Sequence, residues 1–134
     1  MGIISIKGVS SAHAAKLKEE KIKTTEELLK IAGSRQGRKE LAYRTGISEE
    51  LILKWVTQAD LMRIKGIGEE YSDLLEVAGV FTVKELAIRH PQNLHQSIKE
   101  VNAKQKLVRR PPTLSQVQRW VNQAKTLPTV YSYY

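Results

Sequence analysis

Apolar residues recur at helical spacing along the whole chain, and no stretch alternates strictly between apolar and polar residues as a strand does. Residues 49–60 show the helical period of 3.6 best, through the apolar face Leu51, Ile52, Trp55, Val56 and Ala59. We therefore predict an all-α fold. Helices are expected over residues 11–20, 38–44, 49–60, 94–102 and 114–126, with short helices after residues 24, 68 and 82. Several are too short to be stable alone, so tertiary packing has to hold them.

Residues that cap helices mark the expected boundaries. A Ser or Thr followed three residues later by Glu or Gln forms a capping box, because each side chain bonds the backbone amide of the other residue. Such boxes are Thr24/Glu27, Thr82/Glu85 and Thr113/Gln116. Single residues give further boundaries: Gly33 and Ser34 end one helix and start the next, Ser48 caps residues 49–60, and Gly46 and Gly79 end helices.

The segment around Pro91 is interpreted as a break between helices. The residue before a proline resists the helical conformation, so His90–Pro91 is expected to end the helix that follows residue 82. Asn93 is then the expected cap of the helix over residues 94–102. Residues 103–112, with the sequence AKQKLVRRPP, are predicted to form a basic loop that two prolines close.

Two parts of the chain resemble each other. Residues 6–29 align without a gap with residues 64–87 at a shift of 58, and the pentapeptides that begin at Trp55 and Trp120 match at a shift of 65. Self-similarity of this kind indicates a duplicated helical module. We expect a single domain, 1–134, that contains a first repeat unit 1–63, a second repeat unit 64–127 and a C-terminal tail 128–134. The two tryptophans are expected to be equivalent core anchors.

Each repeat unit begins with a glycine-containing turn. In the second unit, Gly66–Ile67–Gly68 is followed by Ser72 and by a helical pattern, which is typical of a helix-hairpin-helix. In the first unit, Gly8–Val9–Ser10 is followed by Ala14, so a serine stands in place of the second glycine. Backbone amides at such a turn and at the next helix start point outward without partners, and that geometry suits a phosphate oxygen.

Composition and charge narrow the class of function. The chain has no cysteine, which excludes a disulfide framework, a thiolate metal site and a thiol nucleophile. Its net charge is +8 and unevenly spread: residues 88–134 carry eight Lys or Arg against one Glu, whereas residues 64–87 carry two against five acids. Basic surfaces attract nucleic acid. With no signal-peptide pattern and no apolar run of the ~18 residues that a span needs, we expect a cytoplasmic protein without a membrane partner.

Nearly the whole chain resembles a bacterial family known only as a domain of unknown function. The resemblance rests on the segments TGISEELILKWVTQADLMRIKGIGEEYSDLLEVAGV, NLHQSIKEVN and KLVRRPPTLSQVQRWVNQAK. It implies two pseudo-repeated helix-hairpin-helix (SAM-like) units, packed as one compact helical domain, and it implies no characterised activity. Helix-hairpin-helix modules in general bind DNA without sequence preference, through turn amides and nearby Lys or Arg on backbone phosphates.

The two turns differ in their neighbours. The first turn is flanked by basic residues and is the better candidate for a phosphate site. It could instead be a tight turn that only packs two helices, in which case the Ser10 hydroxyl would cap the following helix. The second has the better glycine pattern, but Glu69 and Glu70 lie where a phosphate would bind. A structural role is favoured there, or an acidic face that docks a basic protein.

Two other segments have alternative interpretations. The basic run from Lys99 to Arg110 could follow a phosphate backbone, or could be a solvated loop, and it lacks the aromatic residues that stack on single-stranded bases. The tail tyrosines could stack on bases or on a partner, or pack on the domain itself: Tyr131, Tyr133 and Tyr134.

No enzyme active site is evident, and His13, His90 and His95 lack the spacing of metal ligands. We expect no cofactor, no metal and no small-molecule substrate, although turns of this type sometimes hold a monovalent cation on their carbonyls. The expected function is non-catalytic, sequence-independent DNA binding, and the alternative is a protein–protein adaptor. The expected nucleic-acid-binding residues are Lys7, Gly8, Val9, Ser10, His13, Lys16, Lys65, Gly66, Ile67, Gly68, Lys104, Lys106, Arg109 and Arg110.

Overall fold

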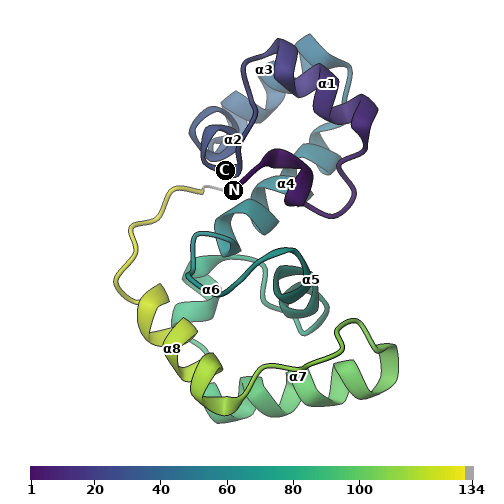
Figure 1. Cartoon of the computed structure of the whole chain (residues 1–134). Helices are drawn as coiled ribbons and strands as arrows, with labels where there is room; N and C mark the ends of the chain where they lie inside the picture. Colours follow the sequence, from purple (N-terminus) through teal and green to yellow (C-terminus); the bar gives the residue numbers. More distant parts are fainter. Residues whose placement is uncertain (132–134) are drawn as a thin grey trace. The chain divides into compact units, whose positions relative to one another are not determined.

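The computed structural model describes residues 1–131, and these residues form helices and connecting turns (Figure 1). A short 3₁₀ helix, η1 (Ile3–Ser5), comes first. The α-helices are α1 (Ser11–Glu19), α2 (Thr25–Ala32), α3 (Arg35–Thr45), α4 (Glu49–Leu61), α5 (Glu69–Val77), α6 (Val83–Ala87), α7 (Pro91–Gln105) and α8 (Leu114–Ala124). Within this range extended pairing is limited to an isolated antiparallel bridge between Gly2 and Thr24. The prediction of an all-α fold is confirmed.

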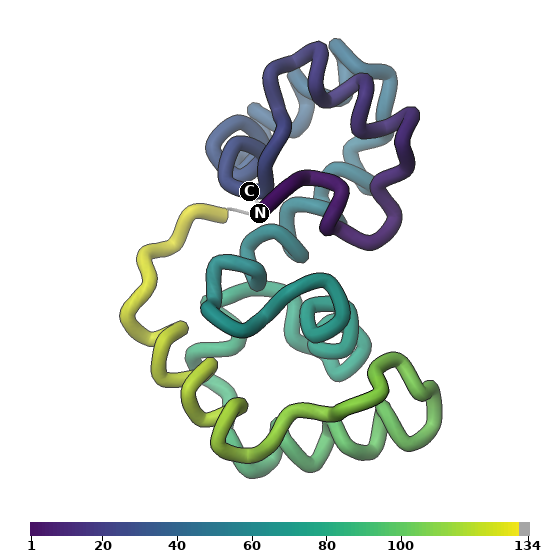
Figure 2. Tube along the Cα trace, in the orientation of Figure 1, coloured from purple at the N-terminus to yellow at the C-terminus, as the bar shows by residue number. Residues whose placement is uncertain are grey.

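The chain forms two compact units. Unit 1 comprises Met1–Asp60 together with the chain end from Val130, and unit 2 comprises Leu61–Thr129. Figure 2 traces the chain beyond α8 to Val130 and Tyr131, which belong to unit 1. The division into repeats at residues 63 and 127 stays a prediction, because a boundary between packed units says nothing about duplication.

Unit 1 is packed around Trp55, which projects from α4 and is fully buried. Further apolar side chains, from α1 to α4 and from the connection after α1, are less than 1 % exposed: Leu17, Ile22, Leu28, Leu41 and Ile52. Arg38 on α3 is also buried, and its guanidinium donates hydrogen bonds to the carbonyls of Ala32 (3.1 Å) and Gly33 (3.0 Å) at the end of α2. These bonds fix how α2 and α3 pack.

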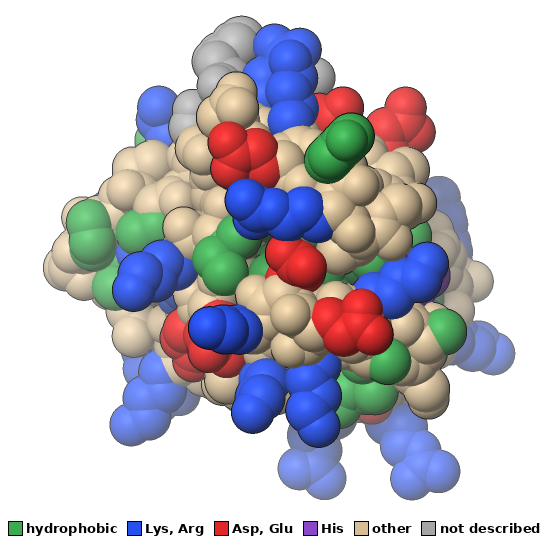
Figure 3. All heavy atoms as spheres, turned by 90° about the horizontal axis from the view of Figure 1, so that it is seen from above, with side chains coloured by type: hydrophobic (Ala, Val, Ile, Leu, Met, Phe, Trp, Pro, Cys, Tyr) green, Lys and Arg blue, Asp and Glu red, His purple; other side chains and the backbone are tan. Residues whose placement is uncertain are grey.

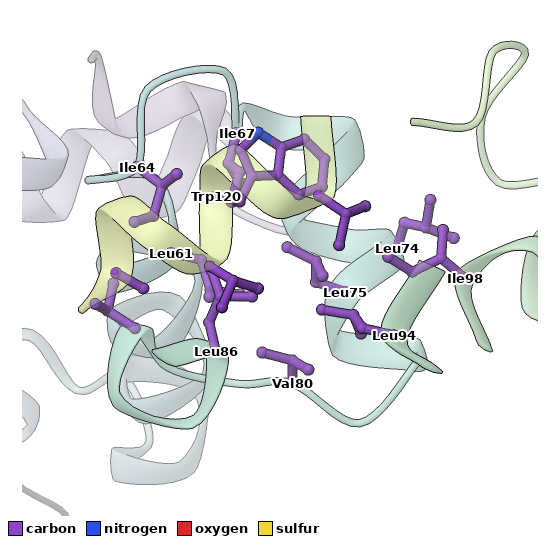
Figure 4. Packing of buried hydrophobic residues seen from close by; sticks show 14 of the residues in the cluster. Leu61, Ile64, Ile67, Leu74, Leu75, Val80, Leu86, Leu94, Ile98 and Trp120 are labelled. Atoms are coloured by element: carbon purple, nitrogen blue, oxygen red, sulfur yellow. The ribbon is translucent and has the colours of Figure 1, made fainter. Parts of the chain in front are cut away.

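Unit 2 has a core of its own, which includes Trp120 of α8. Figure 4 shows the indole next to Ile67, with Leu75 and Leu94 below it. The buried cluster draws on α5, α6, α7, α8 and the segment that precedes α5, and it includes Leu61, Ile64, Leu74, Val80, Leu86, Ile98, Val117 and Val121. The expectation that both tryptophans are core anchors is therefore confirmed.

Most expected caps are present. Complete capping boxes join Thr24 to Glu27 and Thr113 to Gln116. Ser34 caps α3, and the Ser48 hydroxyl accepts from the amide of Leu51 at the start of α4 (3.2 Å). Gly46 ends α3 in the left-handed conformation, and Gly79 has a positive φ after α5. Thr82 accepts from the Glu85 amide, as expected for the start of α6.

The break predicted before Pro91 is confirmed, because α6 ends at Ala87, but the cap and the bounds predicted for the next helix were wrong. The helix expected over 94–102 begins at Pro91 and runs to Gln105, and its cap is His90, whose Nδ1 accepts from the amide of Asn93 (3.5 Å). Proline suits the first position of a helix, where its missing N–H would have no partner and its fixed φ already fits. Lys104 therefore lies on α7 and not in a loop, and Lys106 ends the helix with a left-handed φ of 51°.

Replacing Glu27 with Gln is expected to weaken the acid sensitivity of the fold. The amide of Lys23, followed by the hydroxyl and amide of Thr24, hydrogen-bonds the carboxylate and lowers the pKa of Glu27 below its usual value. A depressed folded-state pKa contributes stability above the unfolded-state pKa, and this contribution is lost as the pH falls through the folded value. Gln keeps an acceptor, as Gln116 shows in α8, but it does not titrate.

Urea denaturation of both proteins at neutral pH and near pH 3 measures this effect, because that interval covers the usual titration range of a carboxylate, around 4. The difference in unfolding free energy between wild type and Glu27→Gln should shrink on acidification. A difference that stays constant with pH would contradict the assignment.

Candidate nucleic-acid interface

The turn of unit 1 is tight because one glycine adopts a conformation that other residues avoid. Gly8 has a φ of +93°, in the left-handed region, and the following Val9 amide donates to the Ile6 carbonyl (3.2 Å). A Cβ built on Gly8 would lie 3.8 Å from the indole Nε1 of Trp55. The turn therefore sits directly on the core tryptophan of its unit.

Several backbone donors remain unused at this turn. Within the described residues, the amides of Gly8, Ser10, Ser11 and Ala12 make no hydrogen bond. The last two are the first amides of α1, where the helix dipole favours negative charge. An oxyanion bound here would meet backbone donors that are already held in place by the turn.

The other expected residues of this turn have different roles. Val9 is 7 % exposed and its amide is used internally, so neither its side chain nor its N–H is available to a ligand. Ser10 is the cap of α1, as the alternative interpretation anticipated, since its Oγ accepts from the His13 amide (3.1 Å). The His13 ring packs edge-on against Trp55, with ring centroids 5.1 Å apart. Lys7 and Lys16 are exposed beside the turn.

Unit 2 contains a turn with the same backbone geometry. Gly66 has a φ of +96°, the Ile67 amide donates to the Ile64 carbonyl (3.1 Å), and a Cβ on Gly66 would lie 3.2 Å from Trp120 Nε1. Tyr71 takes the place that His13 has in unit 1, and its ring centroid is 5.2 Å from that of Trp120. Lys65 is exposed, and its amide donates to Gln123 Oε1 of α8 (2.9 Å).

The second glycine of the pattern is not needed for the bend. Gly68 is the residue before α5 and has a φ of −112°, which is extended backbone. The corresponding Ser10 has a φ of −75° and caps α1. Serine is a preferred residue at a helix N-cap, so the turn of unit 1 loses nothing by having it. Only the first glycine of each turn has a positive φ.

The helices that follow the two turns carry opposite charge. The helix after the first turn, α1, carries two lysines and one glutamate. The helix after the second turn, α5, carries four acidic side chains and neither Lys nor Arg, and Glu69 and Glu70 are exposed in its first turn. A phosphate approaching the free amides of Glu69 and Glu70 would meet like charges. The first turn is therefore the better candidate for an anion site.

A second basic surface lies on unit 2, where α7 ends and the connection to α8 begins. Lys104, Lys106, Arg109 and Arg110 are all exposed there. Asn102 holds this connection through two hydrogen bonds with the backbone of Val108 (2.9 and 3.1 Å). The Tyr71 hydroxyl donates to the Arg110 carbonyl (2.9 Å), which ties the basic segment to α5. In the space-filling view of Figure 3, Lys and Arg side chains project at many points around one face of the molecule, with acidic groups between them.

The structure groups the expected site residues in two sets. Residues 7–16 belong to unit 1, and residues 65–68 and 104–110 belong to unit 2. Of the tail tyrosines, Tyr131 packs on its own domain, with its ring 5.5 Å from the Arg38 guanidinium, while Tyr133 and Tyr134 lie outside the described residues. Sequence reasoning missed Arg38, because a charged residue on a short helix is usually exposed.

Among residues 1–131, His, Asp and Glu side chains form no group of three that could hold a metal ion. No helix in the same range has the length and apolar character needed to cross a membrane.

The chain belongs to the family described as a domain of unknown function, DUF4332, whose sequence pattern matches residues 7–127. No solved structure gives a significant match to the chain. The resemblance to a family of unknown function is thus confirmed, and the function has to be argued from the residues themselves.

Proposed function

We propose that the protein binds the phosphate backbone of double-stranded DNA without sequence preference, and that each unit is built on a helix-hairpin-helix. One observation carries the proposal: the Gly8 turn offers four backbone amides without partners within the described residues, and the exposed Lys7 and Lys16 lie close to it in the sequence. Contacts from amides and lysines to phosphates position a protein on a duplex but carry no sequence information.

The correspondence between the units supports the repeat. Features of the first turn recur 58 residues later: the positive-φ glycine, the ring on the core tryptophan, and a threonine cap in the form of Thr24 and Thr82. A bond from residue 22 to the Leu17 carbonyl also recurs as Val80 to Leu75, both at 2.9 Å. In the proposed complex, the first turn and the basic segment 104–110 contact phosphates, and the acidic second turn does not.

Fluorescence anisotropy with a labelled random-sequence duplex, at several salt concentrations, tests the proposal. The logarithm of the binding constant should fall linearly with the logarithm of the salt concentration, with a slope of about −0.9 for each phosphate contacted. Replacing Lys7 and Lys16 with Ala should weaken binding and make the slope shallower by about two, because each lost phosphate contact removes about one unit. The pair Arg109 and Arg110 is expected to behave in the same way.

The matched controls remove the same number of charges elsewhere in each unit. Lys39 and Lys54 in unit 1, and Lys84 and Lys125 in unit 2, are exposed and lie outside the proposed surface. Their replacement with Ala should have a clearly smaller effect. Equal losses in test and control variants would mean that only net charge matters. Absence of binding at ~50 mM salt, where phosphate contacts are strong, would refute the proposal.

The backbone amides can be tested separately through Ser11, the first residue of α1. Proline is favoured at this helix position, and Ser10 before it has the extended conformation that a following proline requires. Ser11→Pro should therefore keep the fold while it removes one free amide and weakens DNA binding, whereas Ser11→Ala should bind like the wild type. Equal affinity of the two variants would argue against amide-mediated contacts.

A further inference from the structure

The outward side of α5 combines acidic and apolar side chains. Its buried face is formed by Ser72, Leu74 and Leu75, which leaves Glu69, Glu70, Asp73, Glu76 and Val77 on the opposite face. Val77 is 41 % exposed, and the next exposed apolar side chains along the chain are Phe81 (41 %) and Ile88 (83 %). We refer to the exposed acidic and apolar side chains of residues 69–88 together as the acidic–apolar face.

The fold does not require this chemistry. At the shift of 58 residues, Lys18 corresponds to Glu76, Glu19 to Val77, and Lys23 to Phe81, and all three side chains of unit 1 are exposed. The same backbone arrangement thus tolerates charged residues at the positions where unit 2 exposes valine and phenylalanine. Exposed apolar side chains that folding does not need indicate a surface that another molecule covers.

A surface of complementary chemistry lies on the same unit. The Tyr71 hydroxyl bond to the Arg110 carbonyl places the basic segment beside α5. Next to this segment is an open cavity of about 380 Å³ lined by His95, Lys99, Pro111, Pro112, Thr113 and Leu114. Two prolines and a leucine are among its lining residues, and Lys99 with the neighbouring Arg109 and Arg110 makes its surroundings basic. We refer to this as the basic groove.

We propose that unit 2 pairs with unit 2 of a second copy of this chain, with the acidic–apolar face of each copy on the basic groove of the other. Glu69 and Glu70 make no ion pair within residues 1–131, and opposite charges across an interface favour the pairing and set its register. Both surfaces lie on the same unit, and each is complementary to the other. A two-fold symmetric dimer therefore forms the same contact twice, once from each copy.

This inference goes beyond the proposed function and does not rest on it. Arg109 and Arg110 also belong to the proposed DNA surface, so association is measured without DNA. Sedimentation velocity of the full chain over a range of concentrations should show a mass that rises from the monomer toward the dimer. The association should weaken at high salt, because surface charges are screened beyond about 3 Å at 1 M ionic strength.

A charge exchange identifies the second copy as the partner. Glu69→Lys with Glu70→Lys places two positive charges on the acidic–apolar face, and Arg109→Glu with Arg110→Glu places two negative charges beside the basic groove. Each variant alone should be monomeric. An equimolar mixture should recover the dimer, because the reversed charges of one variant then face the reversed charges of the other, and the second pair of surfaces is unchanged. A mixture that stays monomeric where the wild type associates would overturn the arrangement.

The contribution of Val77 and Phe81 to the dimer is tested by replacing each with the residue that unit 1 has at the corresponding position, Glu19 and Lys23. Val77→Glu with Phe81→Lys should abolish association at concentrations where the wild type is dimeric, while circular dichroism shows unchanged helix content. The control is Tyr43→Ser on unit 1, which removes an apolar side chain that is 91 % exposed and should leave the dimer intact. A wild-type protein that remains monomeric at every concentration and salt, or equal losses in both variants, would refute the proposal.

Discussion

Replacing Trp55 with alanine is expected to lower the free energy of unfolding by about 3–5 kcal/mol, the usual cost of truncating a buried tryptophan. Its side chain is fully buried, and it contacts both the His13 ring and the Gly8 turn. A domain with a total stability of about 5–15 kcal/mol would lose a large part of it. Because the indole supports the turn, the variant should also lose affinity for DNA under the proposed function.

Phenylalanine at the same position should be much less costly. Within the described residues, Nε1 of Trp55 is buried and has no hydrogen-bond partner. Removing that N–H leaves no other group unsatisfied, so Trp55→Phe loses only volume and is expected to cost about 1–2 kcal/mol.

Urea denaturation followed by circular dichroism measures both variants, and the fluorescence of the remaining Trp120 reports on unit 2. The expected order of stability is wild type, Trp55→Phe, Trp55→Ala. An alanine variant within about 1 kcal/mol of the wild type, the average effect of any point mutation, would show that the indole does not anchor unit 1. Equal costs for Phe and Ala would show that the N–H has a stabilising partner.

Local signals predicted most helix starts correctly, because a cap is a contact between residues three apart in the sequence. Thr24, Ser34, Ser48, Thr82 and Thr113 all cap the helices expected of them. Such contacts need no knowledge of the rest of the fold. These capping residues mark the starts of short helices, and for this reason the sequence could be interpreted as all-α.

The errors occurred where one residue type permits two structures. Pro91 was interpreted only as the end of the preceding helix, which does end at Ala87. A proline also starts a helix when the residue before it is extended, and His90 has a ψ of 119°. The end of α7 was missed because Lys106 adopts a left-handed conformation that usually belongs to glycine or asparagine. The end of α7 is also held by the Asn102 side chain, which makes two hydrogen bonds with the backbone of Val108, six residues further on.

For the candidate site, the sequence located both turns but not the role of each residue. The spacing of Gly66 and Gly68 suggested that both glycines allow the bend, whereas only the first needs its conformational freedom. Val9 and Ile67 are both buried, and Ile67 lies next to Trp120, which is 53 residues away in the sequence (Figure 4). The opposite charge of α1 and α5, in contrast, could be read directly from the sequence.

Replacing Gly37 with alanine provides a test in which two physical effects have opposite signs. Gly37 lies inside α3, and helix propensity alone predicts that alanine would stabilise the helix by up to about 1 kcal/mol. A Cβ at this position, however, would lie 2.0 Å from the carbonyl oxygen of Ile31 on α2. Since the obstacle is backbone, α2 and α3 would have to move apart.

Moving these helices apart would also strain the bonds from Arg38 to the carbonyls that end α2. A buried guanidinium that loses its acceptors is costly, so we expect Gly37→Ala to destabilise the protein by about 2–4 kcal/mol. The neighbouring Gln36 is exposed on the same helix turn, and Gln36→Ala should change the stability by no more than about 0.5 kcal/mol. Urea denaturation of both variants gives the sign: a Gly37→Ala protein more stable than the wild type would mean that helix propensity, and not the close approach of α2 and α3, determines the residue at this position.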